Sequence, residues 1–568
     1  MAQVARRRLT EAGMTNQERQ PLSHASPYAG RWVARLHGKI VAQGATAEEA
    51  RRAAQTHRHK ESPEIVFMPA FPFSPLLASV RESLPPGQAI HLVGGALRDA
   101  LLGRDSHDLD FVVPAGGIRL ARRVADALRA DFFPLDEERD TGRVLLAGED
   151  GTRTILDFAS YRGASLDEDL RARDFTVNAL AFDLQSESLH DPLGGGLDVR
   201  QKRLRACGPT SLADDPIRIL RAVRLAAALG FQVEAGTRQD MKQAAAGLRS
   251  VSPERLRDEL FRILEGPQPG AAIRALDVLG ALSHVLPELA ALKGVEQPSP
   301  HVYDVWAHTL SALDHLEKIL SALAPGYDPE TAGDLYTGLL TLRLGRYREQ
   351  LAAHFAESLN ADRSVRALLG FAALYHDVAK PGCKVVDEQG GLHFWGHDEQ
   401  GAEIAAARAD ALHLSNPEIQ RLRLIVRHHM RPHFHSNRME AEGKLPSRRA
   451  IYRFFRDAGE AGVDLVLLAL ADARATRGHT LQQEGWTAML DVCRIFLENY
   501  WEKPAETVAP PPLLNGHELM GALDLSPGPQ VGELLEAIRE AQATGKVETR
   551  DQALFFAREQ IANLQSKI

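Results

Sequence analysis

The sequence has few cysteines and no long apolar run. Only three cysteines, Cys207, Cys383 and Cys493, occur among its 568 residues, and none stands at the spacing of a zinc site or a disulfide framework. This usage is typical of the reducing cytoplasm. No stretch approaches the ~18 apolar residues of a membrane helix, and the basic start MAQVARRR is not followed by an apolar segment. We therefore expect a cytoplasmic protein with no membrane span and no secretion signal.

The sequence also lacks an excess of positive charge. Its 67 lysines and arginines are outnumbered by 75 aspartates and glutamates, which gives a net charge of −8. This balance excludes a uniformly basic nucleic-acid coat, so RNA binding would need a local basic strip. The arginine-rich segments at residues 218–231 and 252–264 could line one, although arginines are also common on plain solvent-exposed helix faces. A chain of this length is too long for one core and predicts about three to four domains.

The most informative stretch runs from His91 to Val113, HLVGGALRDALLGRDSHDLDFVV. A short apolar strand ends at Gly94 and Gly95, where the absence of Cβ atoms lets the backbone approach a triphosphate. A helix is predicted over residues 96–102. It would offer its first N–H groups to anionic oxygens, with Arg98 as a bidentate phosphate donor.

Two carboxylates follow on the next predicted strand. Asp108 and Asp110 alternate in DLDFVV, and the two-residue period of a strand turns both side chains to one face. Carboxylates so placed can hold the Mg²⁺ ions that align a 3′-hydroxyl with an α-phosphate. A glycine pair alone is usually a turn, and two alternating aspartates are often a solvated loop. Their joint order predicts a two-metal nucleotidyl-transfer site.

Three further motifs follow in sequence, namely EDLRARDFTVNALAFD (Glu168 to Asp183), DDPIRILRAVRLAAALGF (Asp214 to Phe231) and SPERLRDELFRIL (Ser252 to Leu264). The whole series resembles the class II nucleotidyltransferases of the polymerase-β type, which comprise the bacterial tRNA CCA-adding enzymes and the poly(A) polymerases close to them. The resemblance implies an α+β fold, with a polymerase-β-like head followed by an all-α neck and body. It also implies template-independent addition of CMP and AMP, from CTP and ATP, to the 3′ end of tRNA, with Mg²⁺ in the head.

The motif RARDFTVNA supplies candidates for nucleotide binding. Arg173 could meet the triphosphate, while Asp174 and Asn178 offer the acceptor and amide groups that grip a ribose hydroxyl. The alternative is a strand cap with a buried asparagine. By resemblance, a third catalytic carboxylate stands on a strand beside the first two, and Asp157 in TRTILDFASYR is the candidate. The alternative there is a strand-end aspartate at a turn.

The motif DDPIRILR places Asp215 and Arg218 one helical turn apart, which gives one acceptor and one planar donor fork. Such a pair can recognise the Watson–Crick edge of a base, although taken alone it would most often be a surface salt bridge. By resemblance, Asp215 and Arg218 form the protein template that selects C and then A. Arg221 is expected to face the phosphates.

One departure from the family concerns a loop. Only about ten residues, Ser160 to Asp169, separate the strand of Asp157 from the DFTVNA segment, and so short a loop cannot sweep far. Members of the family that add only the two C residues have a truncated loop at this point. Addition of CC alone is therefore an alternative to full CCA addition. Poly(A) synthesis is a second alternative, which a long basic tail would have favoured.

A second constellation lies in a histidine-rich helical region between residues 300 and 475. HD dipeptides alone prove nothing, because four occur in a chain with 22 histidines. The order H … HD … H … HH … D is the stronger observation, and it resembles the HD-domain metal phosphohydrolases. The segments that form it are VWAHTL (His308), LYHDVAK (His376 and Asp377), FWGHDEQGAE (His397), VRHHMRPH (His428, His429 and His433) and ALADARA (Asp472).

This second resemblance implies a divalent metal site that activates water, with Mg²⁺, Mn²⁺ or a transition metal as the ion. His308, His376, Asp377 and Asp472 would hold one ion, and His397 and His429 would allow a second. The roles of His428 and His433 stay open, and any one histidine alone would more often be structural. Some bacterial CCA-adding enzymes carry such a domain as a phosphatase or 2′,3′-cyclic phosphodiesterase, so a phosphoester hydrolase is implied.

The organisation along the chain follows from these motifs. We predict a β-β-α-β extension at residues 1–70, the nucleotidyltransferase head at 71–210, a helical neck at 211–295, the HD-type domain at 296–500 and a helical tail at 501–568. The expected partners are tRNA, CTP and ATP, with no membrane and no protein partner. A hypothesis from another functional class is a non-catalytic RNA-binding protein whose only chemistry is that of the HD site.

Overall fold

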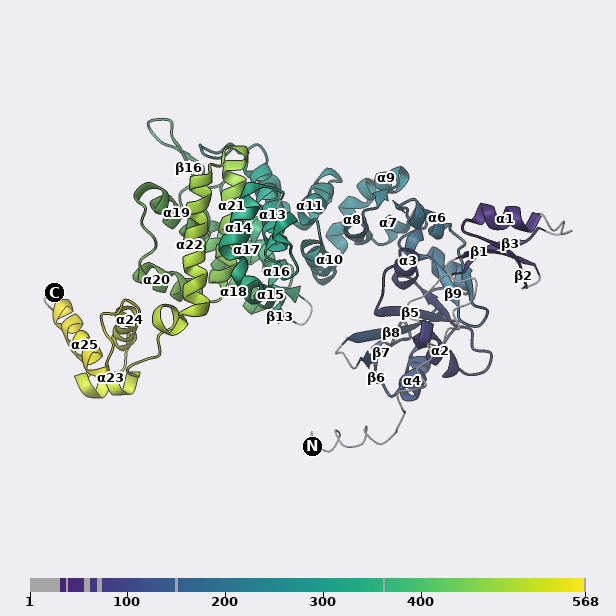
Figure 1. The fold of residues 1–568 in the computed structure, drawn as a ribbon, viewed down its shortest axis with the longest axis horizontal. Coiled ribbons are helices and arrows are strands. Elements are labelled where there is room, and N and C mark those ends of the chain that lie inside the picture. Colours follow the sequence, from purple (N-terminus) through teal and green to yellow (C-terminus); the bar gives the residue numbers. More distant parts are fainter. Residues whose placement is uncertain are drawn as a thin grey trace. The chain divides into compact units, whose positions relative to one another are not determined.

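The computed structural model describes residues 31–36, 39–55, 62–68, 74–148, 152–331, 333–360 and 363–565. The chain forms two compact units, Met1–Ser211 with Gln232–Thr237, and Leu212–Phe231 with Arg238–Ile568. Within the described residues, the first unit combines strands with short helices, and the second is almost entirely helical (Figure 1). The predicted α+β class is therefore confirmed. Residues 1–30, where the predicted extension begins, lie outside the described part.

A seven-stranded sheet forms the centre of the first unit, in the order β10-β9-β4-β5-β8-β7-β6. Strands β5 and β8 are parallel and the other neighbours are antiparallel. The strands are β4 (His91–Val93), β5 (Asp108–Val113), β6 (Asp131–Asp136), β7 (Thr141–Ala147), β8 (Arg153–Ser160), β9 (Ala181–Asp183) and β10 (Ser188–His190).

The two faces of β5 have different surroundings. Leu109, Phe111 and Val113 belong to the main core of this unit, and Phe111 stacks on Phe158 of β8 with 4.8 Å between ring centroids. Val112 belongs to a smaller apolar cluster on the other side. The strand alternation thus places the aspartates at positions 108 and 110 on the face away from the main core. The helices of this unit are α1 (Ala47–Gln55), α2 (Ser74–Glu82), α3 (Gly95–Leu101), α4 (Gly117–Leu128), α5 (Leu166–Arg171), α6 (Gly195–Arg200) and the 3₁₀ turn η2 (Thr176–Asn178).

Two smaller sheets complete the first unit. Strands β1 (Arg31–Leu36), β2 (Lys39–Gly44) and β3 (Glu64–Met68) form an antiparallel sheet in the order β2-β1-β3, with α1 between β2 and β3 in the sequence. Strand β11 (Arg203–Leu204) pairs in parallel with β12 (Gln232–Val233). Residues 232–237 thus belong to the first unit, although the preceding residues 212–231 belong to the second unit.

The second unit contains long helices around a core of their apolar faces. Helices α16 (Val365–Tyr375) and α21 (Ala461–Arg477) are largely apolar in sequence and are buried along most of their length. Helices α23, α24 and α25 share a separate core. No helix in the described ranges is long and apolar enough to cross a membrane. The elements are α7 (Ser211–Asp214), α8 (Arg218–Leu229), α9 (Ala235–Ala244), α10 (Pro253–Glu265), α11 (Pro269–Val278), α12 (Leu282–Val285), α13 (Val305–Ala322), α14 (Leu335–Leu344), α15 (Arg348–Ala356), β13 (Ser358–Asn360), β14 (Arg363–Ser364), α16 (Val365–Tyr375), β15 (Val385–Val386), β16 (Leu392–His393), α17 (His397–Ala411), α18 (Asn416–His428), α19 (Met430–Glu442), α20 (Arg448–Ala458), α21 (Ala461–Arg477), α22 (Gln483–Glu502), α23 (Gly516–Leu523), α24 (Pro529–Ala543) and α25 (Arg550–Gln565).

Candidate functional site

The turn between β4 and α3 brings together three of the predicted site residues. Gly94 has φ of +81°, a conformation that favours glycine. A Cβ atom at this position would lie 3.0 Å from Oδ2 of Asp110 and 3.4 Å from Nη1 of Arg173. The carboxylate and the guanidinium therefore both face the glycine turn. Helix α3 begins at Gly95, one residue before the predicted start.

The predicted carboxylates lie on neighbouring parallel strands. Asp110 of β5 is in register with Asp157 of β8, so the two side chains project from the same face. Both oxygens of Asp157 are bound by Arg143, with 2.7 Å from Nε to Oδ1 and 2.7 Å from Nη2 to Oδ2. This hydrogen bonding is the largest cause of the raised pKa of Arg143, and the charge of Asp108 also contributes. The sequence did not point to Arg143, which comes from the adjacent strand β7.

The other nucleotide-binding candidates of the head form an internal network. Nη1 of Arg98 donates to Oδ1 of Asn178 at 2.7 Å, and Nδ2 of Asn178 donates to Oδ1 of Asp174 at 3.1 Å. Arg98 also binds both carboxylate oxygens of Asp99. Three of the five N–H donors of this buried guanidinium are thus engaged. The phosphate-binding role of Arg98 stays a prediction.

A carboxylate that the sequence did not single out orients Arg173. Asp169 is 1% exposed, and its Oδ2 accepts from Nε of Arg173 at 3.1 Å. Its Oδ1 accepts from the backbone N–H of Arg162 at 3.1 Å. The spacing of four residues between Asp169 and Arg173 was the available signal, although α5 ends at Arg171 and Arg173 lies just beyond it. Asp169 therefore ties the loop after β8 to the side chain that faces the Gly94 turn.

In the second unit, the predicted base-selecting pair has a further partner. Nε of Arg218 lies 3.8 Å from Oδ2 of Asp215, and Nη2 of Arg255 on α10 lies 2.8 Å from the same oxygen. Asp215 stands before α8, whose first residue is Arg218, and Arg221 is exposed on that helix. Arg255 belongs to the SPERLRDEL motif, which was assigned only to a basic strip. The two motifs therefore converge on one carboxylate.

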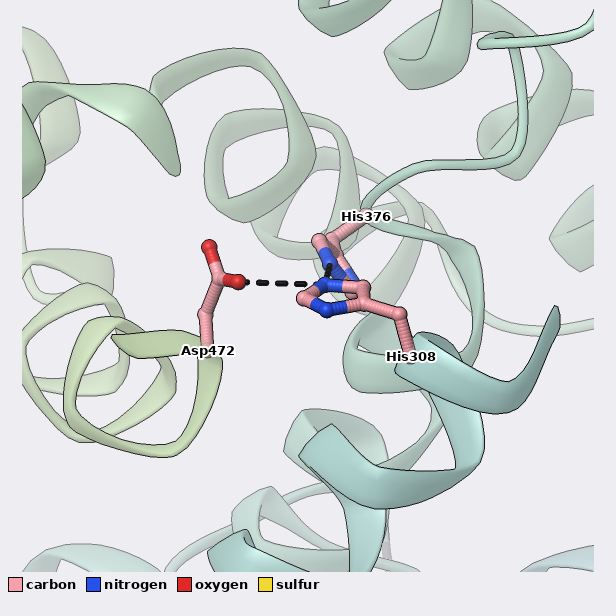
Figure 2. A group of neighbouring side chains, drawn as sticks. All are labelled: His308, His376 and Asp472. Carbon is pink, nitrogen blue, oxygen red and sulfur yellow. Dashed lines mark hydrogen bonds and ion pairs between the residues drawn. The ribbon is translucent and has the colours of Figure 1, made fainter. Parts of the chain in front are cut away.

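The predicted ligands of the HD region come together in the second unit. Nε2 of His308 on α13 lies 3.2 Å from Nε2 of His376 and 3.1 Å from Oδ1 of Asp472 on α21. Figure 2 shows the three side chains pointing toward one another from separate elements. All three residues are buried, with exposed fractions of 6% or less. Their donor atoms lie close enough to hold one metal ion.

Asp377 joins this group to a second one. Its Oδ2 lies 3.2 Å from Nε2 of His376 and 3.4 Å from Nε2 of His308. Its Oδ1 lies 3.5 Å from Nε2 of His397 and 3.7 Å from Nε2 of His429. One carboxylate therefore faces two sets of imidazoles. We call these six residues, His308, His376, Asp377, His397, His429 and Asp472, the histidine–aspartate centre.

The hydrogen bonds of the imidazoles fit the centre to a cation. The Nδ1 atoms of His376, His397 and His429 donate to backbone carbonyl oxygens at 2.8, 2.7 and 2.6 Å. Their Nε2 lone pairs then point inward, as in metal-binding histidines. Oδ1 of Asp377 is buried without a hydrogen-bond partner, and a buried acceptor in that state is costly. A metal ion bound by these atoms would satisfy both the lone pairs and the carboxylate.

The electrostatics of the centre favour the binding of a cation. Burial lowers the pKa of His376, but the charge of Asp377 and a hydrogen bond to it outweigh burial and raise the pKa to about 9, so a metal ion that binds Nε2 would displace a proton from it. Burial acts to raise the pKa of Asp472, yet the nearby His433 and His308 hold it well below its usual range. The buried carboxylates are thus ionised and available as ligands.

Further side chains surround the centre. Nζ of Lys380 lies 2.7 Å from Oδ2 of Asp377, and the three-residue spacing in HDVAK was the available signal for this lysine. Nε2 of His433 lies 2.8 Å from Oδ2 of Asp472. The ring of His301 lies 5.4 Å from that of His308. His301 and Lys380 were not predicted from the sequence.

Four family models match the sequence. They are the Poly A polymerase head domain at residues 90–205, the RNA and SrmB-binding site of polymerase A at residues 230–293, the HD domain at residues 349–476, and the tRNA nucleotidyltransferase domain 2 at residues 508–557. The first match contains the aspartates of β5 and β8. The HD match contains every residue of the histidine–aspartate centre except His308.

Relatives match over most of their length. The chain is 37% identical over 481 residues to the A-adding tRNA nucleotidyltransferase of Deinococcus radiodurans, covering 83% of this chain and 95% of that protein. It is 35% identical over 473 residues to the CC-adding tRNA nucleotidyltransferase of Thermus thermophilus, covering 82% and 92%. Among solved structures, a complex of a CCA-adding enzyme with ATP matches with a TM-score of 0.53 and 22% identity, over 86% of this chain and 94% of that one. The last match shows a shared fold.

Proposed function

Because the chain belongs to the family of tRNA nucleotidyltransferases, as its motifs predicted, we propose that its head adds nucleotides from CTP or ATP to the 3′ end of tRNA. The 3′-hydroxyl oxygen of the tRNA forms a bond to the α-phosphorus and loses its proton to water, the bond from that phosphorus to the bridging oxygen breaks, and pyrophosphate leaves. The observation that carries the proposal is the meeting of Asp110 and Arg173 at the Gly94 turn. It combines an acidic metal ligand, a cationic phosphate donor and an open backbone.

The residues of the head take the following roles in this proposal. Asp108 and Asp110 would hold Mg²⁺, whose chemistry when bound is to neutralise charge on the reacting phosphate. Arg173, held by Asp169, binds the triphosphate. The linked side chains of Asp174 and Asn178 grip the ribose, and Arg98 holds Asn178 in place.

In the second unit, Asp215 and Arg218 select the base, and Arg221 is proposed to contact phosphate. Arg255 supports this function by holding the Asp215 carboxylate at 2.8 Å, which leaves that residue with a fixed orientation. The side chains of Asp215 and Arg218 are only partly exposed. Partial burial reduces the competition of water for the hydrogen bonds that they would make to a base.

We further propose that addition stops after the two C residues. Strand β8 ends at Ser160 and α5 begins at Leu166, which leaves five residues between them. The backbone N–H of Ala164 donates to Glu168, and that of Arg162 donates to Asp169. A connection this short and this well anchored cannot sweep from one nucleotide to the next. The names of the relatives support partial addition in this family, by C or by A.

The experiment uses the full chain with Mg²⁺ and two labelled substrates. A tRNA that lacks the terminal CCA is incubated with CTP, and a tRNA that ends in CC is incubated with ATP. We expect two CMP residues on the first and no AMP on the second. AMP on the second alone would assign A addition, and a long run of AMP would assign poly(A) synthesis. If neither tRNA gains a nucleotide, the protein is an RNA-binding protein whose only chemistry is that of the second unit.

We propose a second activity, metal-dependent hydrolysis of a phosphoester at the histidine–aspartate centre. Six buried ligand atoms with inward lone pairs support divalent metal binding; Mg²⁺, Mn²⁺ and transition metals are the candidates, and the ion when bound would activate water. Water oxygen then bonds to phosphorus, the ester bond breaks, and the leaving alcohol takes a proton. Lys380 is placed beside Asp377 to neutralise charge. Hydrolysis of a 2′,3′-cyclic nucleotide that depends on added metal tests this proposal.

A further inference from the structure

The outer strands of the head sheet have one covered face and one open face. Val144 of β7 and Phe158 of β8 belong to the main core together with Ala121 of α4, so this helix packs on the first face. The alternate side chains of β6, β7 and β8 project from the other face, and none of these described side chains is buried. This open face continues from the strand that carries the proposed catalytic aspartates.

Three side chains of the open face stand in one row beside Asp110. Asp157 of β8 is in register with Asp110 and also with Arg143 of β7. Arg143 is in turn in register with Phe133 of β6. Side chains at paired positions project from the same face, and neighbouring strands are about 4.8 Å apart. We call Asp157, Arg143 and Phe133 the cross-strand row, and its strands lie side by side in Figure 1.

The guanidinium of Arg143 is held in place but is only partly used. Asp157 accepts hydrogen bonds from its Nε and from its Nη2, at 2.7 Å each. Two of the five N–H donors are thus engaged, and the other three have no acceptor among the described residues. The side chain is 29% exposed, so a ligand can reach these donors from solvent.

Phe133 presents its ring on β6, the last strand of the sheet. Its side chain is 38% exposed, whereas the adjacent Phe132 packs against the main core. An exposed ring beside an oriented guanidinium suits single-stranded nucleic acid, because a base stacks on the ring and a phosphate binds the guanidinium.

We propose that the cross-strand row binds the 3′ end of the acceptor tRNA. Arg143 binds the last phosphodiester, and Phe133 stacks on the base before the terminal nucleotide. Asp157 is then a positioning residue, because Arg143 holds both of its oxygens and is oriented by them. The inference rests on the proposed nucleotide addition, and it identifies where the second substrate of that reaction lies.

The direction of attack agrees with this placement. In phosphoryl transfer the attacking and the leaving oxygens lie roughly in line, on opposite sides of the phosphorus. The triphosphate is proposed to bind at the Gly94 turn, which follows β4. The strand order β4-β5-β8-β7-β6 places the cross-strand row on the other side of β5. A 3′-hydroxyl that comes from this side faces away from the leaving pyrophosphate.

The test measures the KM of the full chain for each of the two substrates. The acceptor is a tRNA that already carries one C, so that its last two nucleotides are unpaired, and CTP with Mg²⁺ is the donor. Arg143→Ala should raise the KM for the tRNA about tenfold or more, the effect of losing a hydrogen bond to a charged group, with the KM for CTP nearly unchanged. An unchanged KM for the tRNA would overturn the inference, and a rise in the KM for CTP instead would place Arg143 at the nucleotide.

The same contact can be removed from the RNA. A methylphosphonate in place of the last phosphodiester carries no charge, and it should raise the KM of the parent about as much as Arg143→Ala does. It should have little further effect in the variant, because the contact is already absent. Equal effects in the two proteins would exclude Arg143 as the partner of that phosphate. If Arg143→Ala does not fold, Arg143→Lys replaces it, because an ammonium lacks the fork that binds Asp157 and a phosphate together.

The stacking contact is tested in the same way. Phe133→Ala should raise the KM for the tRNA about fivefold or more, the loss of one base stack, and Phe133→Trp should retain the affinity. Removal of the base before the terminal nucleotide should raise the KM of the parent and not that of Phe133→Ala. The same effect in both proteins would exclude stacking on this ring.

Two control variants lie elsewhere on the head. Leu197→Ala removes an exposed side chain from α6, and Arg81→Ala removes an arginine that pairs with Glu187 at 2.8 Å. Both should leave the two KM values unchanged.

If the parent adds no CMP, the proposed nucleotide addition fails by itself. Fluorescence anisotropy of the same labelled tRNA with the parent and with Arg143→Ala then decides the role of the cross-strand row. Weaker binding by the variant supports that role, and equal affinities exclude it.

Discussion

Asp110 is proposed as a metal ligand, and it lies beside the turn that is proposed to bind phosphate. Its carboxylate faces the Gly94 turn together with Arg173, and its strand lies in register with that of Asp157. It makes no contribution to the main core, which lies on the other face of β5. Its removal should therefore damage chemistry more than folding.

We expect Asp110→Ala to abolish incorporation of CMP while tRNA binding persists, because the variant would lose a proposed metal ligand and no RNA contact. Labelled-nucleotide incorporation and a tRNA mobility shift measure the two effects. Asp126→Ala, an exposed carboxylate on α4, is the control and should keep full activity. Residual incorporation above about a tenth of the parent would count against the assignment, since loss of a metal ligand normally costs several kcal/mol of transition-state stabilisation.

Arg218 is expected to affect base choice more than triphosphate binding. Its guanidinium is placed beside Asp215, and Arg255 keeps that carboxylate bound even when Arg218 is absent. Arg218→Ala should therefore reduce the preference for CTP over UTP and GTP, by about tenfold, with a smaller change in the KM for triphosphate. Competition assays with all four nucleotides measure this preference. An unchanged preference would make Arg218 a structural residue.

The residues that the sequence predicted are those whose function depends on local spacing. The strand period alone predicts that Asp108 and Asp110 share a face, and β5 has that alternation. The partners of other candidates come from distant positions. Asn178 binds Arg98 across 80 residues, and Arg143 reaches Asp157 from a neighbouring strand. No local pattern contains such contacts, so the buried state of Arg98 could not be foreseen.

At the scale of elements, the turn between β4 and α3 is a site where backbone geometry and chemistry coincide. Gly94 and Gly103 both have positive φ values, +81° and +70°. An added Cβ meets Asp110 and Arg173 at the first and nothing within 4 Å at the second. Alanine variants at Gly94 and Gly103 therefore distinguish the effect of backbone strain from the effect of crowding the Asp110 and Arg173 side chains.

Gly94→Ala and Gly103→Ala should each lower the free energy of unfolding by about 1–3 kcal/mol, the cost of a non-glycine residue at positive φ. Only Gly94→Ala should also lower nucleotide incorporation, by about tenfold or more, because its Cβ displaces the two functional side chains. Denaturant unfolding and the incorporation assay measure both quantities. Equal activity of the two variants would show that the turn tolerates a Cβ and does not approach a substrate closely.

The helices that carry the histidine–aspartate centre illustrate what the order of residues in the sequence can and cannot predict. The sequence order of its histidines and aspartates predicted the six ligands, and the structure brings all six together. The sharing of Asp377 between two groups depends on the packing of α13, α17 and α21 around the end of α16. Those helices are far apart in the sequence, and other helices stand between most of them, so the sequence alone could not show that one carboxylate faces both sides.

At the scale of the whole molecule, the two sets of functional residues belong to different units. The aspartates of β5 and β8 lie in the first unit and the histidine–aspartate centre lies in the second. No ligand of the centre is shared with the head. The two activities should therefore be separable by mutation.

His376→Ala combined with Asp377→Ala should remove metal-dependent hydrolysis of 2′,3′-cyclic nucleotides, while nucleotide addition to tRNA continues. Both activities and the Tm are measured on the same double variant. The control is His354→Ala, which breaks a buried cluster with Asp464 and Arg421 and should lower the Tm without affecting metal content. Joint loss of both activities with a large fall in Tm would instead identify the centre as a structural metal site.

The return of residues 232–237 to the first unit has a consequence for anyone who builds chimaeras from these proteins. Strand β12, the partner of β11, follows α8 in the sequence. A head that ends at Ser211 therefore lacks β12 and leaves Arg203 and Leu204 without a partner strand. A grafted head needs the whole segment through Thr237, and with it the helix that carries Arg218. Exchange of heads between relatives would therefore transfer the proposed base-selecting pair together with the proposed catalytic aspartates as one segment of the chain.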